Sequence, residues 1–238
     1  MLSPSRAIIS LLSCIGLAAC AGYALPPDPV TGAASGRIPT NSSIEYRDTP
    51  IRVIQPALPQ VKIANSQRLG NNAAKIGIIE FSDYQCIYCA EFHRKKFPRI
   101  RKEYVDTGVV LFIHKDLPLP MHPQAMPAAI AARCAGAQGR FWDMHDALFA
   151  HQDKLNQNSY PGLAKELKLD EAKFRACFEN KASYQDIGKD VKTARALGLG
   201  GTPSFLIGTI QNDVLTVMRQ SSGAPDFSEF AREIEKLR

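Results

Sequence analysis

Hydrophobic positions along the chain fall into continuous runs of strand length and into stripes at helical spacing. The runs KIGIIEF at 75–81 and VVLFI at 109–113 are nearly unbroken, which is typical of strands covered on both faces of a sheet. Between them, apolar residues recur at helical spacing over 86–104, with basic residues on the opposite side. This stretch predicts a strand-helix-strand unit whose helix is kinked at Pro98.

The region after this unit is dominated by helical patterns. Four segments are expected to be helical, and they cover 125–137, 141–149, 163–167 and 172–178. Ser183 with Asp186 forms a capping-box pattern, which predicts a further helix ending at Gly198. We therefore expect a helical insertion at about residues 121–197.

Strand character returns after the insertion. The segments GLGGTPSFLIG at 198–208 and DVLTVMR at 213–219 predict two more strands, and Asp226 opens a last helix with one apolar face. The expected order is βαβ, helical insertion, ββα, which indicates an α/β fold. In a chain of 238 residues, we expect one domain over 68–238 that includes the insertion.

The start of the chain predicts an export signal. Residues 1–19 combine a single cation with an apolar core too short for a typical membrane-spanning helix, as in a signal peptide. The sequence LAAC ending at Cys20 resembles the lipobox of bacterial lipoproteins, which implies a lipid anchor on Cys20. Because Ala21 is not an aspartate, the resemblance favours the outer membrane. Ordinary cleavage after Ala21 or Ala24 is the alternative.

Residues 20–67 are rich in Pro, Gly, Ser, Thr and Asn, which predicts a tether between the membrane and the domain. Its short apolar piece IRVIQ at 51–55 can still dock as an edge strand. The formal net charge of +6 does not indicate a nucleic-acid partner, because the Lys and Arg residues are spread between acids. We expect no nucleic acid among the partners.

The stretch FSDYQCIYCAEFH at 81–93 places two cysteines three positions apart, where the first strand turns into the helix. At a helix start the first sulfur faces unpaired N–H groups and the positive end of the helix dipole, which favour the thiolate. A lowered thiol pKa stabilises the reduced pair and makes its disulfide a stronger oxidant. We therefore assign Cys86 as the exposed nucleophile and Cys89 as the buried resolving thiol.

A metal site and a structural disulfide are the alternatives for this pair. Cys86, Cys89 and His93 have C-x2-C-x3-H spacing, but no second Cys/His pair follows at the distance that a structural zinc site requires. Ala90 stands where a c-type haem motif carries histidine. A disulfide closing so small a ring removes little entropy from the unfolded chain. A redox pair without metal, and without any cofactor besides its own disulfide, is therefore favoured.

Four blocks of sequence follow one another in the chain: EFSDYQCIYC, HKDLPLP, CAGAQGRFWDMHDALF and GLGGTPSFLIG. Together they resemble the DsbA-like family of exported thiol-disulfide oxidoreductases, over roughly 68–238. The resemblance implies a thioredoxin fold with an inserted helical domain, and disulfide exchange with the thiols of other proteins.

The resemblance also implies roles for residues around the pair. Pro203 is expected to be a cis-proline facing the sulfurs, with Thr202 offering backbone groups to a bound peptide; an ordinary trans turn is the alternative. Glu80 matches the family's buried acid, and Lys115 stands where its partner is often found. We expect a raised pKa for Glu80, which would let it accept the proton of Cys89. The alternative for Glu80 is a solvated carboxylate at the strand end.

Two further cysteines, Cys134 and Cys177, lie in the helical insertion. In an oxidising compartment we expect them to bond to each other, closing a ring of about 44 residues and adding about 4 kcal/mol in the chain-entropy model. Two buried free thiols are the alternative.

Three functions are compatible with the sequence. The first is an oxidase that forms disulfides in newly exported proteins through a mixed disulfide at Cys86 and exchanges electrons with a membrane redox partner. Because Ile87 and Tyr88 replace the Pro-His of the most oxidising relatives, we expect a milder oxidant. The second is a reductase or isomerase, and the third is a lipoprotein that binds peptides without catalysis. The sequence does not predict the oligomeric state.

Overall fold

The structure, a computed structural model, describes residues 57–180 and 183–238. The predictions for 1–19, for the lipid anchor at Cys20 and for strand docking at 51–55 lie outside the described residues.

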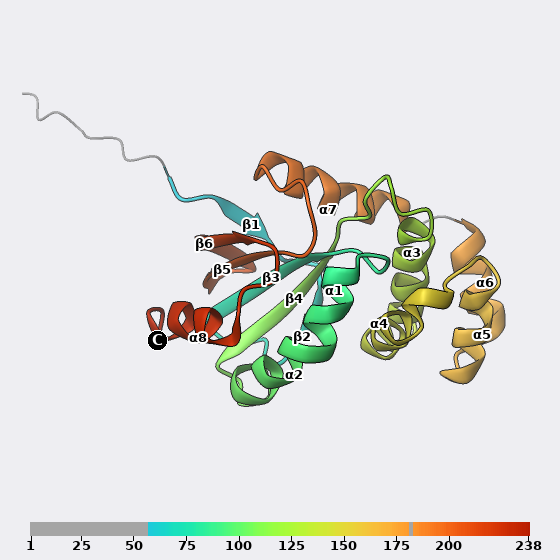
Figure 1. The fold of residues 1–238 in the computed structure, drawn as a ribbon, viewed down its shortest axis with the longest axis horizontal. Helices are drawn as coiled ribbons and strands as arrows, with labels where there is room; N and C mark the ends of the chain where they lie inside the picture. Colours follow the sequence, from blue (N-terminus) through green and yellow to red (C-terminus); the bar gives the residue numbers. More distant parts are fainter. Residues whose placement is uncertain (1–56, 181–182) are drawn as a thin grey trace, which may run out of the picture. The chain divides into compact units, whose positions relative to one another are not determined.

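A six-stranded sheet, in the order β1-β6-β5-β3-β4-β2, forms the centre of the described part of the chain (Figure 1). Strand β3 pairs in parallel with β4 and antiparallel with β5, so the expected βαβ and ββα units share one sheet. The strands are β1 (Gln60–Lys62), β2 (Gln67–Leu69), β3 (Ile76–Ser82), β4 (Val110–Asp116), β5 (Ser204–Gln211) and β6 (Val214–Ser222).

The helices fall into three groups. Figure 1 shows α3, α4, α5 and α6 gathered on one side of the sheet, as expected of an inserted helical region. The helix after β3 comprises α1 (Ile87–Glu91), η1 (Phe92–Lys96), α2 (Phe97–Ile100) and η2 (Arg101–Val105). The insertion contains α3 (Ala125–Gly136), α4 (Phe141–Ala150), η3 (Gln152–Lys154), α5 (Ser159–Glu166), α6 (Glu171–Asn180) and α7 (Tyr184–Ala196), and α8 (Phe227–Glu235) follows β6.

The helix between β3 and β4 is irregular on both sides of Pro98. Its turns at Phe92–Lys96 and Arg101–Val105 are π-helical, with α-helical turns before and between them. Proline has no N–H to donate to the preceding turn, so the regular hydrogen-bond pattern is interrupted there. The sequence predicts a kink at Pro98, and the structure has π-helical turns on both sides of this residue.

Alternation along the strands divides the hydrophobic core between the two faces of the sheet. One face packs against α7, with residues such as Ile79, Leu111 and Ala194. The other packs against the helix after β3 and against α8, with residues such as Ile78 and Phe230. A third cluster fills the insertion and includes the cysteine pair, so the active-site candidate lies where the sheet meets the insertion.

The predicted domain boundary at residue 68 is wrong, because the folded chain begins earlier. Strand β1 pairs with β6, and β2 begins at Gln67 and pairs with β4. Val61 and Ile63 are buried in the core. Both strands span only three residues and include polar ones, so they produce no continuous hydrophobic run.

The predicted capping box at the start of α7 is also wrong. Ser183 precedes the helix, but its backbone is already helical (φ −69, ψ −15) and its side chain makes no capping hydrogen bond. A capping side chain reaches the first turn from an extended backbone, which Ser183 does not have. Asp186 instead accepts a hydrogen bond from Lys189 at 2.7 Å.

A disulfide joins α3 to α6 within the insertion. It connects Cys134 and Cys177, the expected pair, with their Cα atoms 5.7 Å apart. The cross-link ties the alanine-rich helix that packs near the cysteine pair to the outer part of the insertion.

Candidate active site

Cys86 and Cys89 lie where β3 turns into α1. Cys86 precedes the first helical residue with an extended backbone (φ −71, ψ 118), and its carbonyl accepts the N–H of Ala90 at 3.1 Å. Cys89 is in the first turn of the helix. Both are free thiols, so the structure presents the reduced form of the pair.

Cys86 is buried and not exposed as the sequence analysis expected, since only 5% of its surface is accessible. Its sulfur lies 3.2 Å from the backbone carbonyl oxygen of Thr202, to which only the protonated form of Cys86 donates a hydrogen bond. The loop that carries Thr202 therefore covers the sulfur. Thr202 and Tyr88 also line a cavity that does not include Cys86 itself.

The surroundings of Cys86 lower its pKa to about 5. The hydrogen bond from the Cys89 thiol is the main cause, and it outweighs burial, which raises the pKa. Thr202 and the backbone N–H groups of Cys89 and Tyr88 lower it further. The Thr202 hydroxyl has no hydrogen-bond partner within the described part of the chain, so it is available to the ionised sulfur. Cys86 is therefore a thiolate at neutral pH.

Cys89 has the opposite preference. It is fully buried, and burial raises the pKa of its thiol well above the ordinary value. The hydrogen bond with Cys86 and the negative charge of Glu80 raise it further, while a hydrogen bond with the hydroxyl of Ser82 lowers it. The pair thus consists of one stabilised thiolate and one thiol that keeps its proton.

Glu80 is buried below the pair, as expected, but its pKa is not raised. Burial alone would raise it, yet the charge and hydrogen bond of His93, with smaller contributions from His114 and His145, leave the pKa below the ordinary value. His93 Nε2 lies 2.9 Å and 3.1 Å from the two carboxylate oxygens. The Ser82 hydroxyl donates to the carboxylate at 2.9 Å. Glu80 is therefore an ionised, hydrogen-bonded carboxylate.

Lys115 is not the partner of Glu80, contrary to the expectation from the family resemblance. Its ammonium group donates to Asp190 of α7 at 2.7 Å. The strand register explains the difference, because Glu80 pairs with His114 while Phe81 pairs with Lys115. Residues in register share a face and successive residues alternate, so Lys115 lies on the opposite face from Glu80.

The loop before β5 faces the cysteine pair. The Thr202–Pro203 peptide bond is cis, as expected. The carbonyl of Pro203 accepts the N–H of Gly223 at 2.8 Å, and the Ser204 hydroxyl donates to the carbonyl of Gly201 at 2.7 Å. These bonds hold the loop in place, with the Thr202 carbonyl against the sulfur of Cys86.

Asp83, which the sequence analysis did not assign, organises the turn before Cys86. Its buried carboxylate accepts the N–H groups of Gln85 at 2.7 Å and Leu119 at 2.8 Å, and it lies 2.8 Å from Nδ1 of His122. Aspartate bonded to a backbone N–H two residues ahead is a common turn signal, so the first of these bonds could have been found from the sequence. The other two join segments far apart in the chain.

Gln152 supports the same turn from the insertion. Its side-chain amide donates to the carbonyls of Tyr84 at 2.8 Å and Cys86 at 2.9 Å. This residue was also missed, because no local pattern marks a contact across 66 positions. The insertion thus fixes the backbone that carries the reactive sulfur.

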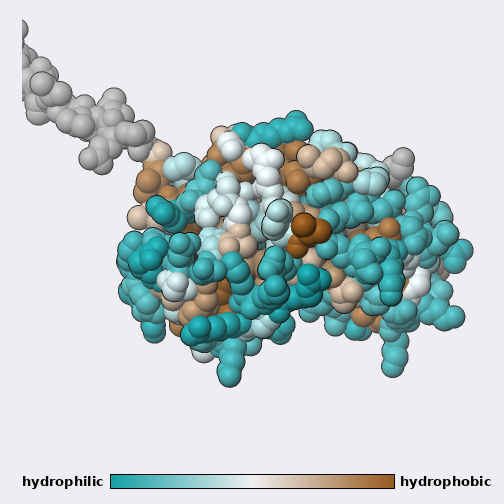
Figure 2. Space-filling model, in the orientation of Figure 1, coloured by the Kyte–Doolittle hydropathy of each residue, from teal (hydrophilic) through white to brown (hydrophobic). Residues whose placement is uncertain are grey.

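A cavity of about 310 Å³ adjoins the pair, lined by Tyr88, Glu91, Phe92, Lys96, Thr202, Gly223 and Ala224. Large hydrophobic side chains are exposed in this part of the chain, among them Ile87 (66%) and Tyr88 (62%) in α1. Met121, after β4, is also exposed (70%). In Figure 2 most of the visible surface is hydrophilic and the hydrophobic areas are small and separate.

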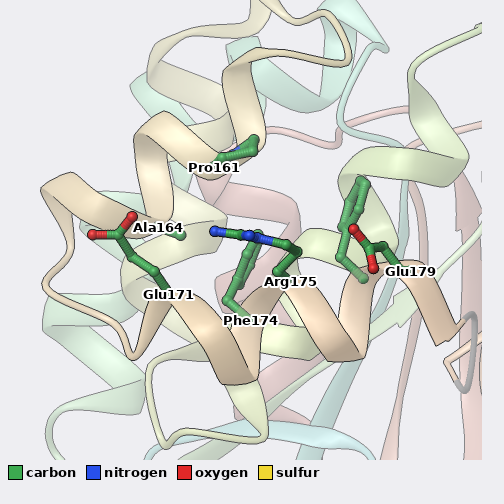
Figure 3. A pocket seen from close by; sticks show the side chains of 7 residues that line it. Pro161, Ala164, Glu171, Phe174, Arg175 and Glu179 are labelled. Carbon is green, nitrogen blue, oxygen red and sulfur yellow. The ribbon is translucent and has the colours of Figure 1, made fainter.

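A second cavity, of about 190 Å³, lies between α5 and α6 in the insertion (Figure 3). Pro161 and Ala164 of α5 face Phe174 of α6 across it, and Glu171 and Arg175 of α6 also line it. None of the residues that line it belongs to the cysteine pair or to the loop of Thr202. It is therefore separate from the candidate active site.

The described residues contain no group of three His, Cys, Asp or Glu side chains placed to hold a metal ion. His93, the third residue of the C-x2-C-x3-H pattern, is bonded to Glu80. Within 57–180 and 183–238, no helix combines the length and apolar character needed to cross a membrane.

Comparison with known proteins defines the class. The family model described as thioredoxin matches residues 63–219, and the chain belongs to this family. In structure, it is similar to alpha-DsbA1 of Wolbachia pipientis, with a TM-score of 0.63 and 28% identity over 76% of this chain and 92% of that one. The chain thus has a DsbA-like thioredoxin fold, and Cys86 and Cys89 form its C-x-x-C pair.

Two proteins that are similar in sequence match part of this chain and part of their own length. A candidate protein-disulfide oxidoreductase of Rickettsia conorii is 28% identical over 167 residues, which make up 66% of this chain and 60% of that protein. The Na(+)/H(+) antiporter NhaA 3 of Salinispora tropica is 36% identical over 139 residues, 58% of this chain and 21% of the antiporter. The chain thus spans about a fifth of one relative and three fifths of the other, and the match to the antiporter covers one segment of it.

Proposed function

We propose that the protein is an exported oxidase that donates the Cys86–Cys89 disulfide to newly exported proteins with free thiols. The observation that carries this proposal is the placement of the two sulfurs: Cys86 stands at the start of α1 against the loop of Thr202, and Cys89 is fully buried one turn further on. This placement lowers the pKa of Cys86 to about 5 and raises that of Cys89. Stabilising the reduced pair makes the disulfide form a better oxidant.

In the proposed reaction a substrate thiolate attacks the Cys86 sulfur of the oxidised pair. A substrate–Cys86 disulfide forms, the Cys86–Cys89 bond breaks, and Cys89 leaves with the electron pair and takes up a proton. A second substrate thiolate then attacks the sulfur of the substrate in this mixed disulfide, and Cys86 leaves as a thiolate. The substrate loses two electrons and the cysteine pair gains them, so the reaction balances.

The surface next to the pair suits an unfolded protein segment. The cavity is lined by Thr202, whose carbonyl contacts the Cys86 sulfur, and exposed Ile87 and Met121 offer apolar contact. We assign the backbone of Thr202, before the cis bond to Pro203, to binding the substrate chain. Apolar contacts and backbone hydrogen bonds recognise exposed chains with little dependence on sequence.

The proposal extends to the arrangement of the whole chain. Residues 1–19 act as the signal peptide, lipid on Cys20 holds the protein at a membrane, most favourably the outer membrane, and the segment that follows is a tether to the domain. A membrane redox partner restores the disulfide. These assignments rest on the sequence patterns described above.

The alternative is a reductase or isomerase, which Tyr88 favours, since it cannot supply the imidazolium that stabilises the thiolate in the strongest oxidants. Equilibrium with glutathione separates the two. We expect a reduction potential well above about −270 mV, the value of thioredoxin, and below about −120 mV, that of the most oxidising relatives. A value near −270 mV would contradict the oxidase proposal.

Trapping tests for exchange chemistry itself. In the Cys89→Ser variant the mixed disulfide at Cys86 cannot be resolved internally, so it should accumulate with exported proteins in cells. The matched control, Cys86→Ser, should accumulate none at the active site. If neither variant forms mixed disulfides while the wild-type protein still binds unfolded peptides, the protein is a peptide-binding lipoprotein instead.

A further inference from the structure

A chain of buried polar groups leads from Cys89 away from the active site. The hydroxyl of Ser82, whose proximity lowers the pKa of Cys89, donates to Glu80 at 2.9 Å. The other oxygen of Glu80 lies 2.9 Å from Nε2 of His93. Cys89, Glu80 and the side chain of His93 are all buried, so water does not reach this part directly.

The chain continues from His93 to His145. The two rings meet edge to face with their centroids 4.4 Å apart. Nδ1 of His93 and Nε2 of His145 are buried and have no hydrogen-bond partner among the residues that the structure describes. The two rings are therefore in contact without a hydrogen bond between them, and a proton passes from one to the other only when a ring turns to bring these nitrogens together. An imidazole can accept a proton at one nitrogen while releasing one from the other.

The far end of the chain is at the surface. Nδ1 of His145 lies 2.8 Å from the carboxylate of Asp146, whose side chain is 64% exposed while that of His145 is fully buried. This bond places the proton of neutral His145 on Nδ1 and leaves Nε2 as an acceptor. His145 is thus oriented to take a proton from inside and to release one to Asp146.

We propose that His93, His145 and Asp146 form a proton path that connects the Ser82–Glu80 pair beneath Cys89 with the solvent. This inference rests on the proposed redox function of the pair. When Cys89 attacks a mixed disulfide at Cys86, its S–H bond breaks, the Cys86–Cys89 bond forms and the bound thiol leaves with the electron pair. The proton of Cys89 passes to Glu80 through Ser82 and leaves along the path to the solvent. In the opposite reaction, a proton moves inward along the same path to Cys89.

The chemistry requires such a path. A buried thiol with a raised pKa attacks slowly unless a base takes its proton. In the opposite direction its thiolate is a poor leaving group unless it receives a proton. Glu80 is an ionised carboxylate and can accept that proton, but it has to pass it on to regain its charge. Because the pKa of Glu80 is lowered, the carboxylate does not keep this proton, so the proton needs an exit.

The groups around His145 keep it neutral. Burial and the charge of His93 are the main causes that lower its pKa to about 3, while the bond with Asp146 raises it. The titratable and charged groups around it come from five segments of the chain: Glu80 of β3, Tyr84 of the following turn, His93 of η1, His114 of β4 and Asp146 of α4 itself. His145 itself therefore adds no charge to the core before a proton arrives.

The test is the lifetime of the mixed disulfide between Cys86 and glutathione. Reduced full-length protein is mixed with oxidised glutathione, quenched with acid at intervals and analysed by mass spectrometry. In Asp146→Asn, the mixed disulfide should form at the wild-type rate and persist about tenfold longer, since general base catalysis contributes at least this much. Asp146→Glu restores the carboxylate and should return most of the rate.

Two further measurements separate proton transfer from a structural effect. Asp143→Asn, a matched change on the same helix whose carboxylate binds Arg140 at 2.7 Å, should leave the lifetime unchanged. Asp146→Asn should also show a larger solvent hydrogen isotope effect on resolution than the wild type. Equal lifetimes and isotope effects in the Asp146→Asn and wild-type proteins would overturn the path. If the wild type forms no mixed disulfide, the proposed function fails instead.

Discussion

The dependence of the reduction potential on pH tests the central feature of the site. Reduction of the disulfide adds two electrons and up to two protons. Below the pKa of Cys86, both sulfurs of the reduced pair hold a proton, so the potential falls by about 59 mV per pH unit. Above that pKa only Cys89 holds one, and the slope halves to about 30 mV per pH unit.

The structure places this change of slope near pH 5, because the pKa of Cys86 is lowered to about 5 and that of Cys89 is raised. Over the two pH units from 5 to 7, the potential should therefore fall by about 60 mV, where a pair with ordinary thiols would lose about 120 mV. At pH 7 the ionised sulfur accordingly makes the disulfide more oxidising by about 60 mV.

Equilibration with glutathione from pH 4 to pH 8, with the redox state read by alkylation and gel shift, gives the slope directly. The rate of alkylation of Cys86 in the reduced protein provides an independent midpoint, which should also lie near pH 5. A slope of about 59 mV per pH unit that continues to pH 7 would refute the reasoning, because Cys86 would then be a neutral thiol at neutral pH.

Two other substitutions test the surroundings of the site. Lys115→Met should reduce the free energy of unfolding by about 3 kcal/mol, as expected for a buried ion pair that loses one member, and leave the potential unchanged; a shifted potential would link Lys115 to the cysteines after all. Replacing Cys134 and Cys177 together by alanine should cost up to about 4 kcal/mol, measured by urea unfolding under oxidising conditions, because the unfolded chain gains entropy; an unchanged midpoint would show that the bond does not stabilise the fold.

Structural features that depend on residues close together in the sequence could be predicted. Continuous apolar runs identified β3 and β4, because both strands are covered on two faces. The cysteine spacing at the start of α1 indicated which sulfur is ionised, because the first turn of a helix offers free N–H groups. Strands β1 and β2 were missed for the converse reason, since three residues with exposed polar positions leave no periodic signal.

Features that depend on contacts between distant segments could not be predicted. The burial of Cys86 follows from the loop at Thr202, which lies 116 positions away in the sequence. The histidines beneath the pair come from three elements, and nothing in the spacing of His93, His114 and His145 indicates that their rings meet. A sequence motif does not determine which distant side chains pack against it. This packing depends on the strand register and on where the insertion lies.

The partner of Glu80 shows how the register changes the chemistry. A shift of one residue between β3 and β4 would place Lys115 beside this acid and send His114 to the face of α7, because side chains alternate along a strand. In the observed register Lys115 binds Asp190, and Glu80 binds an imidazole instead. An ammonium group would hold the carboxylate as a fixed ion pair, whereas an imidazole has a second nitrogen through which a proton can leave. The register thus gives the buried base beneath Cys89 a partner that can pass its proton onward.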